Sequence, residues 1–241
     1  MGKKSIYIEL CADGAHVRAD NGVNGGGGFL RIFRELFAPK VVLIANTPQT
    51  IIRAEKLNDG KQKLTPEAKW GLVKKAFPLG RAVNEESHLF DGCVYSAKER
   101  DAVFLMAALP LETTDDITRL GTEQAGGKRI VRLDTIENMI FRRFCNGDTS
   151  QPPQWVIIPQ GVGYRVLAMA QGVPKDAHYL PVQPEIREGA LLRIYEADAP
   201  EEVILLTRSD WEGFWDDHAG WIKGFAGEQG IKVKMDGFNY H

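Results

Sequence analysis

The amino-acid sequence predicts a mixed α/β fold made of two related halves. Short apolar segments of strand length, such as residues 40–45 and 203–206, alternate with longer segments in which apolar residues recur at helical spacing. The start of the chain and the segment from residue 155 onward both open with a hairpin pattern ahead of a helix and a buried strand. Residues 146–153, between the two segments, have turn and loop chemistry with no aliphatic or aromatic side chain.

The first half is predicted to begin with a β-hairpin. Apolar and polar residues alternate on both sides of Asp13-Gly14, a frequent two-residue turn. After a glycine run, apolar residues at helical spacing predict a helix over residues 29–37. The wholly apolar residues 40–45 then predict a strand that is buried on both faces.

Capping residues mark later helix starts in this half. Thr65 is a typical N-cap ahead of Pro66 at the first helical position, and Asp134 with Glu137 resembles a capping box. The other elements predicted here are strands over residues 89–95, 102–109 and 129–133, a helix from Thr114 to Gly126, and the end of a helix near Phe144.

The second half has the order β-β-β-α-β-α-β. Its predicted strands cover residues 155–158, 164–170, 178–182, 203–206 and 231–235, with helices around 186–194 and from Ser209 onward. Ser209 and Glu212 form a capping-box pattern at the start of the last helix. The aromatic residues Trp211, Phe214 and Trp215 mark the face of this helix that we expect to pack in the core.

This order of elements predicts the architecture. A mixed sheet that begins with a hairpin and is flanked by helices is the plan of ribonuclease-H-like domains. Two such halves in tandem predict an α/β protein with an actin-like arrangement. We place the first half at residues 1–148, with an inserted small subdomain at about 80–126, and the second half at residues 149–241.

A family resemblance rests on a strand over residues 102–110, a following helix, and a short strand that leads into a helix over residues 127–138. With this layout, residues 5–170 resemble the actin-like cytoplasmic proteins of type IV pilus assembly, PilM, and the related cytoplasmic domain of the L component of type II secretion systems. The resemblance implies a non-catalytic scaffold that binds protein partners of an inner-membrane assembly complex. Such partners are the cytoplasmic tail of a membrane protein, an assembly ATPase, or further copies of the scaffold in a homo-oligomer.

The loops that bind nucleotide in other actin-like proteins differ here. Such loops typically read Asp-x-Gly, because glycine lets the backbone approach phosphate and the acid orients a metal-bound water. The first loop of this chain has Glu9 and Asp13-Gly14, and the second has Gln160 in place of an acid, followed by Gly161 and Gly163.

These departures favour a scaffold without a cofactor. The alternative is a divergent ATP-binding protein or ATPase, in which Glu9 and Asp13 coordinate Mg²⁺ and Gly14, Gly161 and Gly163 approach the phosphates of ATP. Tight hairpin turns also require glycine, so a purely structural explanation of the same residues stays open.

Composition narrows the remaining functions. Lys and Arg total 30 against 32 Asp and Glu, so the chain lacks the positive charge that nucleic-acid binding requires. The three cysteines and five histidines show no metal-ligand spacing, and the cysteines are expected to be free thiols. No nucleophile motif is present, and we predict no catalytic or metal-binding residue. A small-molecule enzyme on a ribonuclease-H-like fold is a third, less favoured hypothesis.

Hydropathy indicates where the protein works. The first residues lack the apolar stretch of a signal peptide, and no segment approaches the ~20 apolar residues of a membrane span. We therefore expect a cytoplasmic protein. In this interpretation it reaches the inner membrane through a partner, or through a C-terminal segment beyond His241.

Overall fold

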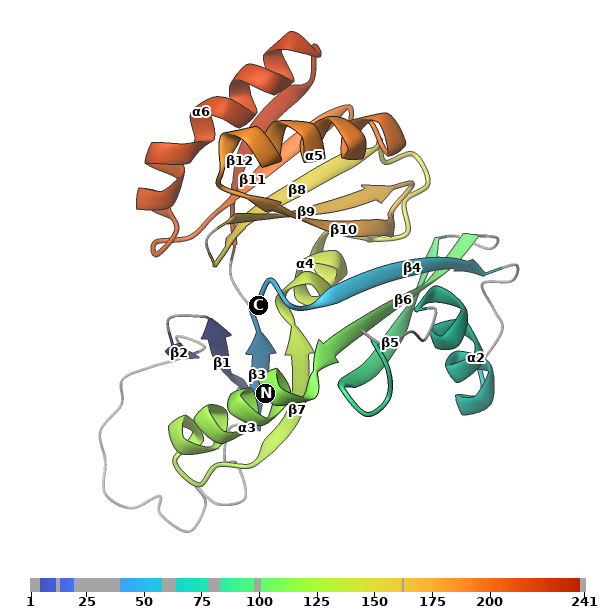
Figure 1. Ribbon diagram of the computed structural model, residues 1–241, viewed down its shortest axis with the longest axis vertical. Helices are drawn as coiled ribbons and strands as arrows, with labels where there is room; N and C mark the ends of the chain where they lie inside the picture. The colour runs from blue at the N-terminus through green and yellow to red at the C-terminus, as the bar shows by residue number, and fades with distance from the viewer. Residues whose placement is uncertain are drawn as a thin grey trace.

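The computed structural model describes residues 5–11, 14–19, 40–57, 64–77, 83–97, 101–161 and 163–238. The described strands form three sheets (Figure 1). A five-stranded sheet lies at one end of the molecule, and a four-stranded and a three-stranded sheet lie at the other. The predicted helix over residues 29–37 and the turn residue Asp13 fall outside the described residues.

The four-stranded sheet has the order β2 (Gly14–Ala19), β1 (Ser5–Cys11), β3 (Lys40–Ala45) and β7 (Ile130–Thr135). β1 and β2 are antiparallel, as the hairpin pattern predicts, whereas β3 lies between two parallel partners. Five of the six residues of β3 are buried because the strand is central, which explains its apolar composition. The fourth strand, β7, is at the edge of this sheet.

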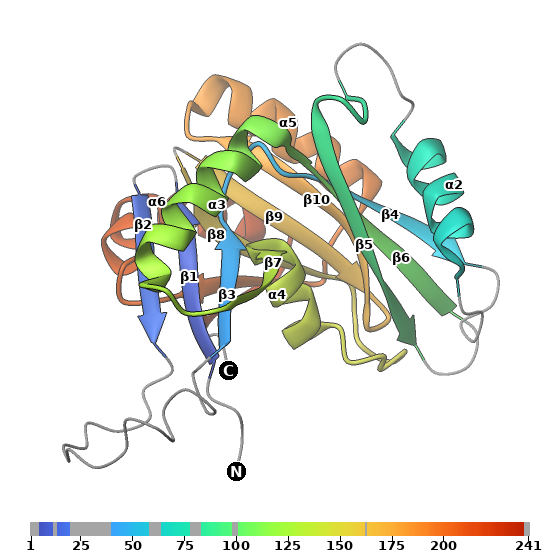
Figure 2. The ribbon, with the colours of Figure 1, turned by 90° about the horizontal axis from the view of Figure 1, so that it is seen from below.

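A helix covers one face of the four-stranded sheet. α3 (Leu111–Ala125) packs against β1 and β3 (Figure 2), and Gly121 lets the helix approach Leu43 closely. The sequence placed the start of this helix at Thr114, but it begins at Leu111 because the preceding strand runs directly into it at Pro110. The predicted end is confirmed by Gly126, whose φ of 57° ends the helix in the left-handed conformation.

The three-stranded sheet has the order β4 (Ile51–Leu57), β6 (Asp101–Pro110) and β5 (His88–Ala97), and all pairs are antiparallel. α2 (Pro66–Ala76) packs against one face of it through Val73 and Phe77. Thr65 caps this helix as predicted, because its side chain accepts a hydrogen bond from the amide of Ala68 at 3.2 Å.

This sheet does not match the predicted subdomain boundaries of about 80–126. β4 lies before residue 80, and α3 packs on the four-stranded sheet instead. The sequence gives little sign of β4 because Arg53, Glu55 and Lys56 interrupt its apolar pattern, as an outer strand with solvent-facing positions permits.

The five-stranded sheet has the order β10 (Val173–Pro181), β9 (Gly163–Ala170), β8 (Gln154–Gln160), β11 (Glu202–Thr207) and β12 (Lys232–Gly237). With α5 (Pro184–Ala197) and α6 (Glu212–Glu228), these strands follow the predicted β-β-β-α-β-α-β order. Both helices pack on the face that carries Trp155, whose ring contacts Tyr195 of α5 and Phe225 of α6. Trp211 and Trp215 are buried as expected, although no side chain caps α6 and the predicted Ser209–Glu212 box is absent.

A central helix joins the two halves. α4 (Ile136–Phe144) buries Ile136, Ile140 and Phe141 completely, and these residues share one core cluster with the five-stranded sheet. Its N-cap is Thr135, which accepts a hydrogen bond from the amide of Asn138, and not the predicted Asp134. The same cluster includes residues of β3, β5 and β6, so the core is continuous between the halves.

No helix among the described residues is long and apolar enough to cross a membrane.

Candidate functional site

The structure places the predicted nucleotide-site residues near the junction of the two halves. Glu9 lies in β1 and is fully buried, and Gly14 pairs with Cys11 at the hairpin end of the same sheet. Gly161 and Gly163 flank the turn between β8 and β9, in the other half.

Glu9 is engaged by a cation from the other half. Its carboxylate oxygens lie 2.8 and 3.2 Å from the two terminal nitrogens of Arg208, which follows β11, and its Oε1 accepts a hydrogen bond of 2.7 Å from Asn46. The side chain of Arg208 is 8% exposed, pairs with Asp210 at 2.6 Å, and lies 3.9 Å from the ring centre of Trp211. The acid that would coordinate Mg²⁺ in the ATP-binding alternative is therefore half of a buried, bidentate ion pair.

The two glycines of the second loop have local structural roles. Gly161 has a φ of 58°, the left-handed conformation that a tight turn requires. At Gly163, a Cβ would lie 2.4 Å from the carbonyl oxygen of Leu180 and 2.6 Å from the hydroxyl of Tyr179. Close packing of β9 against β10 thus explains Gly163 without a ligand.

A second buried polar group, which the sequence did not single out as a site, lies beside that turn. Arg165 of β9 pairs with Glu137 of α4 at 2.8 Å, and Gln160 donates to the same carboxylate oxygen at 3.1 Å. Arg165 also donates to the carbonyl of Thr50 at 2.6 Å, so it ties the five-stranded sheet to the loop after β3. Glu137 was predicted only as a capping residue.

Neither polar group forms a recognisable catalytic or metal centre. Among the described residues, no three His, Cys, Asp or Glu side chains gather as metal ligands. The carboxylates of Glu9 and Glu137 each face an arginine, which leaves the described side chains here suited to holding the halves together.

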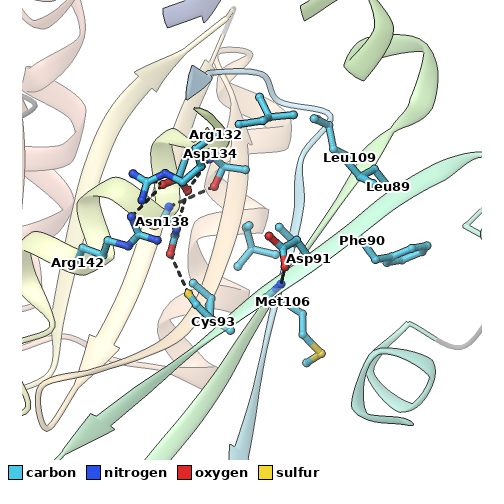
Figure 3. A pocket seen from close by; sticks show the side chains of 16 residues that line it. Leu89, Phe90, Asp91, Cys93, Met106, Leu109, Arg132, Asp134, Asn138 and Arg142 are labelled. Carbon is cyan, nitrogen blue, oxygen red and sulfur yellow. Dashed lines mark hydrogen bonds and ion pairs between the residues drawn. The ribbon is translucent and has the colours of Figure 1, made fainter. Parts of the chain in front are cut away.

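An open groove of about 330 Å³ lies between the three-stranded sheet and the β7–α4 segment (Figure 3). Its lining consists of Ile52 from β4, residues 89–93 of β5, Leu105, Met106, Ala107 and Leu109 of β6, residues 132–135 of β7, and Asn138 and Arg142 of α4. The sequence did not predict this groove.

The floor of the groove is an incompletely covered sheet face. Side chains alternate along a strand, so Leu89, Asp91, Cys93 and Tyr95 share the face of β5 opposite α2. α4 covers the Tyr95 end, where the Tyr95 hydroxyl donates to the carbonyl of Asn138 at 3.1 Å. At the other end Leu109 is buried in a core cluster with Ile117 of α3, whereas its cross-strand neighbour Leu89 remains 43% exposed.

One wall of the groove carries charge. Asp134 at the end of β7 is almost fully buried, and its carboxylate lies 3.0 Å from a guanidinium nitrogen of both Arg132 and Arg142. The backbone amide of Thr135 and the side chain of Asn138 also donate to Asp134. The two arginines are about 40% exposed, at 42% and 40%, so they present charge to the groove. Asp91 lies across the groove from these arginines, on the sheet face that forms the floor (Figure 3).

The thiol in the groove is not activated. Cys93 donates to Oδ1 of Asn138 at 3.0 Å, and burial raises the pKa of its thiol. Burial likewise raises the pKa of Cys145 nearby. A thiol whose pKa is raised stays protonated at neutral pH and is a poor nucleophile.

No protein-family model matches the sequence, and no curated protein sequence matches it. Among solved structures, a Bacteroides thetaiotaomicron protein of unknown function with an actin-like ATPase fold aligns with a TM-score of 0.51 and 12% identity, over 97% of this chain and 91% of that one. The PilM–PilN type IV pilus biogenesis complex aligns with a TM-score of 0.58 and 12% identity, over 98% and 88%.

This chain has the actin-like fold. The predicted fold class and the resemblance to PilM are thereby confirmed. The cytoplasmic domain of EpsL, an inner-membrane component of the Vibrio cholerae type II secretion system, aligns with a TM-score of 0.45 and 13% identity, over 85% of this chain and 82% of that one.

The groove of this actin-like protein combines residues that are far apart in the sequence. Only one sequence pattern indicates the groove, the four-residue spacing of Asp134, Asn138 and Arg142. Residues four apart lie on the same side of a helix, here α4 and the residues just before it. The apolar floor comes from three separate strands, which no local pattern connects.

Proposed function

We propose that this actin-like protein is a non-catalytic scaffold of a type IV pilus or type II secretion-like assembly machine, and that it holds the extended cytoplasmic tail of an inner-membrane partner in the groove beside β7. The observation that carries the proposal is the open groove on the three-stranded sheet, whose apolar lining includes Leu89, 43% exposed, and the partly exposed Ala107. Covering such a surface is favourable because apolar area leaves water.

The two edge strands beside the groove support an extended occupant. β5 and β7 are each at the edge of their sheets, and each lends consecutive residues to the groove walls. Recognition at strand edges commonly uses an extended peptide. The PilM structure of the same fold was obtained as a complex with PilN, which is consistent with a protein partner.

The junction of the halves supports a role without catalysis. Glu9, which would coordinate Mg²⁺ in the ATP-binding alternative, is paired with Arg208. Gly163 is explained by strand packing. At these positions a nucleotide-binding protein would contact its metal ion and phosphates. In this chain Arg208 and the packing of β9 against β10 occupy them.

Filling the groove is expected to abolish tail binding. Ala107 lies on the floor, so Ala107→Trp should occlude it, whereas Ile186→Trp on the exposed face of α5 should not. The measurement is binding of the purified protein to an array of synthetic peptides that covers the cytoplasmic tails of inner-membrane proteins of the source organism. We expect at least one tail to bind the wild type and the Ile186→Trp control, with at least tenfold loss in Ala107→Trp. Absence of any such tail, or binding that Ala107→Trp leaves unchanged, contradicts the proposal.

A divergent ATP-binding protein is the second candidate. Oε2 of Glu137, Oε1 of Gln160 and Oγ1 of Thr50 are buried without a hydrogen-bond partner in the described structure, beside the β8–β9 turn. Buried polar atoms without partners are uncommon and can mark a bound water or ligand.

Mg-ATP at millimolar concentration is expected to leave the thermal unfolding temperature unchanged, because the Glu9 carboxylate is already paired. A ligand at a hundred times its Kd would stabilise the native state by about 2.7 kcal/mol. The control is magnesium chloride alone. A rise in unfolding temperature that grows with nucleotide concentration, and that magnesium alone does not produce, would establish the ATP-binding alternative.

A further inference from the structure

We propose that the groove selects its occupant by charge as well as by shape, and that it fits an extended segment with an acidic residue next to a basic one, flanked by apolar residues. This inference rests on the proposed function, since it concerns the occupant of the same groove. Its basis is the opposite charge of the two sides of the groove, with Arg132 and Arg142 on the β7–α4 wall and Asp91 on the sheet face across from them.

The β7–α4 wall carries an excess of positive charge. Arg132 and Arg142 share the single carboxylate of Asp134, which leaves one guanidinium charge without an anion within this trio. Asp134 also accepts from Asn138 and from the amide of Thr135, so its own position is fixed. A second carboxylate, supplied by the occupant, would complete the neutralisation and can meet a guanidinium through two parallel hydrogen bonds.

The sheet side of the groove carries a negative charge, on Asp91 of β5. Asp91 is exposed, and its Oδ1 accepts a hydrogen bond of 2.7 Å from the amide of Gly92. None of the ion pairs formed among the described residues includes Asp91. A lysine or arginine of the occupant is therefore the matching group on this side.

The alternation of side chains along an extended peptide predicts the order of charged residues in the occupant. Successive side chains of an extended segment point in opposite directions. When the segment lies between β5 and β7, a residue that faces Arg132 and Arg142 has neighbours that face Asp91. An acidic residue should therefore be followed or preceded directly by a basic one. Apolar neighbours can then contact Leu89 and Ala107 on the floor.

The test is selection from a phage-displayed library of random dodecapeptides on the immobilised full chain. Three variants are compared with the wild type. Ala107→Trp blocks the groove, Arg132→Gln with Arg142→Gln removes the positive charge of the β7–α4 wall, and Asp91→Lys reverses the charge on the sheet side. Arg143→Gln is the matched control, because Arg143 adjoins Arg142 in sequence but pairs with Asp236 outside the groove. Thermal unfolding of each variant verifies that it is folded.

We expect peptides whose binding Ala107→Trp abolishes, with adjacent acidic and basic residues enriched among them. The double glutamine variant should lose the acidic preference and weaken these peptides about two- to fivefold, as is usual for solvent-accessible ion pairs. Asp91→Lys, an exposed substitution, should exchange the basic preference for an acidic one. Arg143→Gln should select the same peptides as the wild type.

The outcomes separate the two proposals. Peptides that require an open groove but show no charge preference, or whose preferences survive both sets of charge variants, overturn the charge rule and leave groove binding intact. A selection that yields no peptide sensitive to Ala107→Trp overturns both.

Discussion

Replacing Arg165 with methionine is expected to lower the free energy of unfolding by about 3–5 kcal/mol. The substitution removes the cation that neutralises Glu137, whose side chain is fully buried in α4. Removing one partner of a buried ion pair leaves a charge without compensation in a medium of low dielectric constant. The carbonyl of Thr50 loses a hydrogen-bond donor in the same step. Urea unfolding followed by circular dichroism measures the change.

A second substitution identifies the cause. Adding Glu137→Gln to Arg165→Met removes the stranded charge while keeping a polar side chain beside Gln160. We expect this double variant to regain at least half of the lost stability. A double variant no more stable than Arg165→Met alone would show that the loss comes from packing around Arg165 and not from the charge of Glu137.

Replacing Gly163 with alanine is expected to cost about 3 kcal/mol, the upper part of the range for overpacking. The added Cβ would lie 2.4 Å from the carbonyl oxygen of Leu180. That carbonyl belongs to the backbone of β10, which pairs with β9 along its length, so it cannot move away without disturbing the pairing. Thermal or urea unfolding detects the change.

Gly161→Ala provides the comparison within the same turn. A Cβ there would be 3.6 Å from Pro48, which is an ordinary contact, so the cost is limited to the left-handed φ at about 1 kcal/mol. If Gly163→Ala proves as stable as the wild type, strand packing does not explain this glycine, and an approach to phosphate becomes the better explanation.

The sequence predicted most of the second half correctly because each of its strands has a distinct local pattern. β8 and β11 are buried on both faces, so each contains a short apolar run that predicts a strand. The spacing of aromatic residues along α6 predicts a helix. β4 was missed because its polar positions hide the alternation of a strand with solvent-facing residues. Helix starts were displaced where a strand leads straight into a helix, as at Pro110.

The candidate site was predictable only in part. Glu9 was identified from its place in the first loop, but its partner Arg208 is 199 residues away, and sequence periodicity carries no information about such a pairing. The groove has the same difficulty, since its charged wall and its apolar floor belong to elements that fold together only through the tertiary structure.

The continuous core changes how residues 146–153 should be viewed. Their sequence is typical of a linker, and a linker suggests that the protein can be divided into two separate pieces. Here α4, just before them, is covered by the sheet that begins just after them. A fragment starting at residue 149 would expose to water the sheet face that normally contacts Ile140 and Phe141. Each half therefore covers part of the apolar interior of the other.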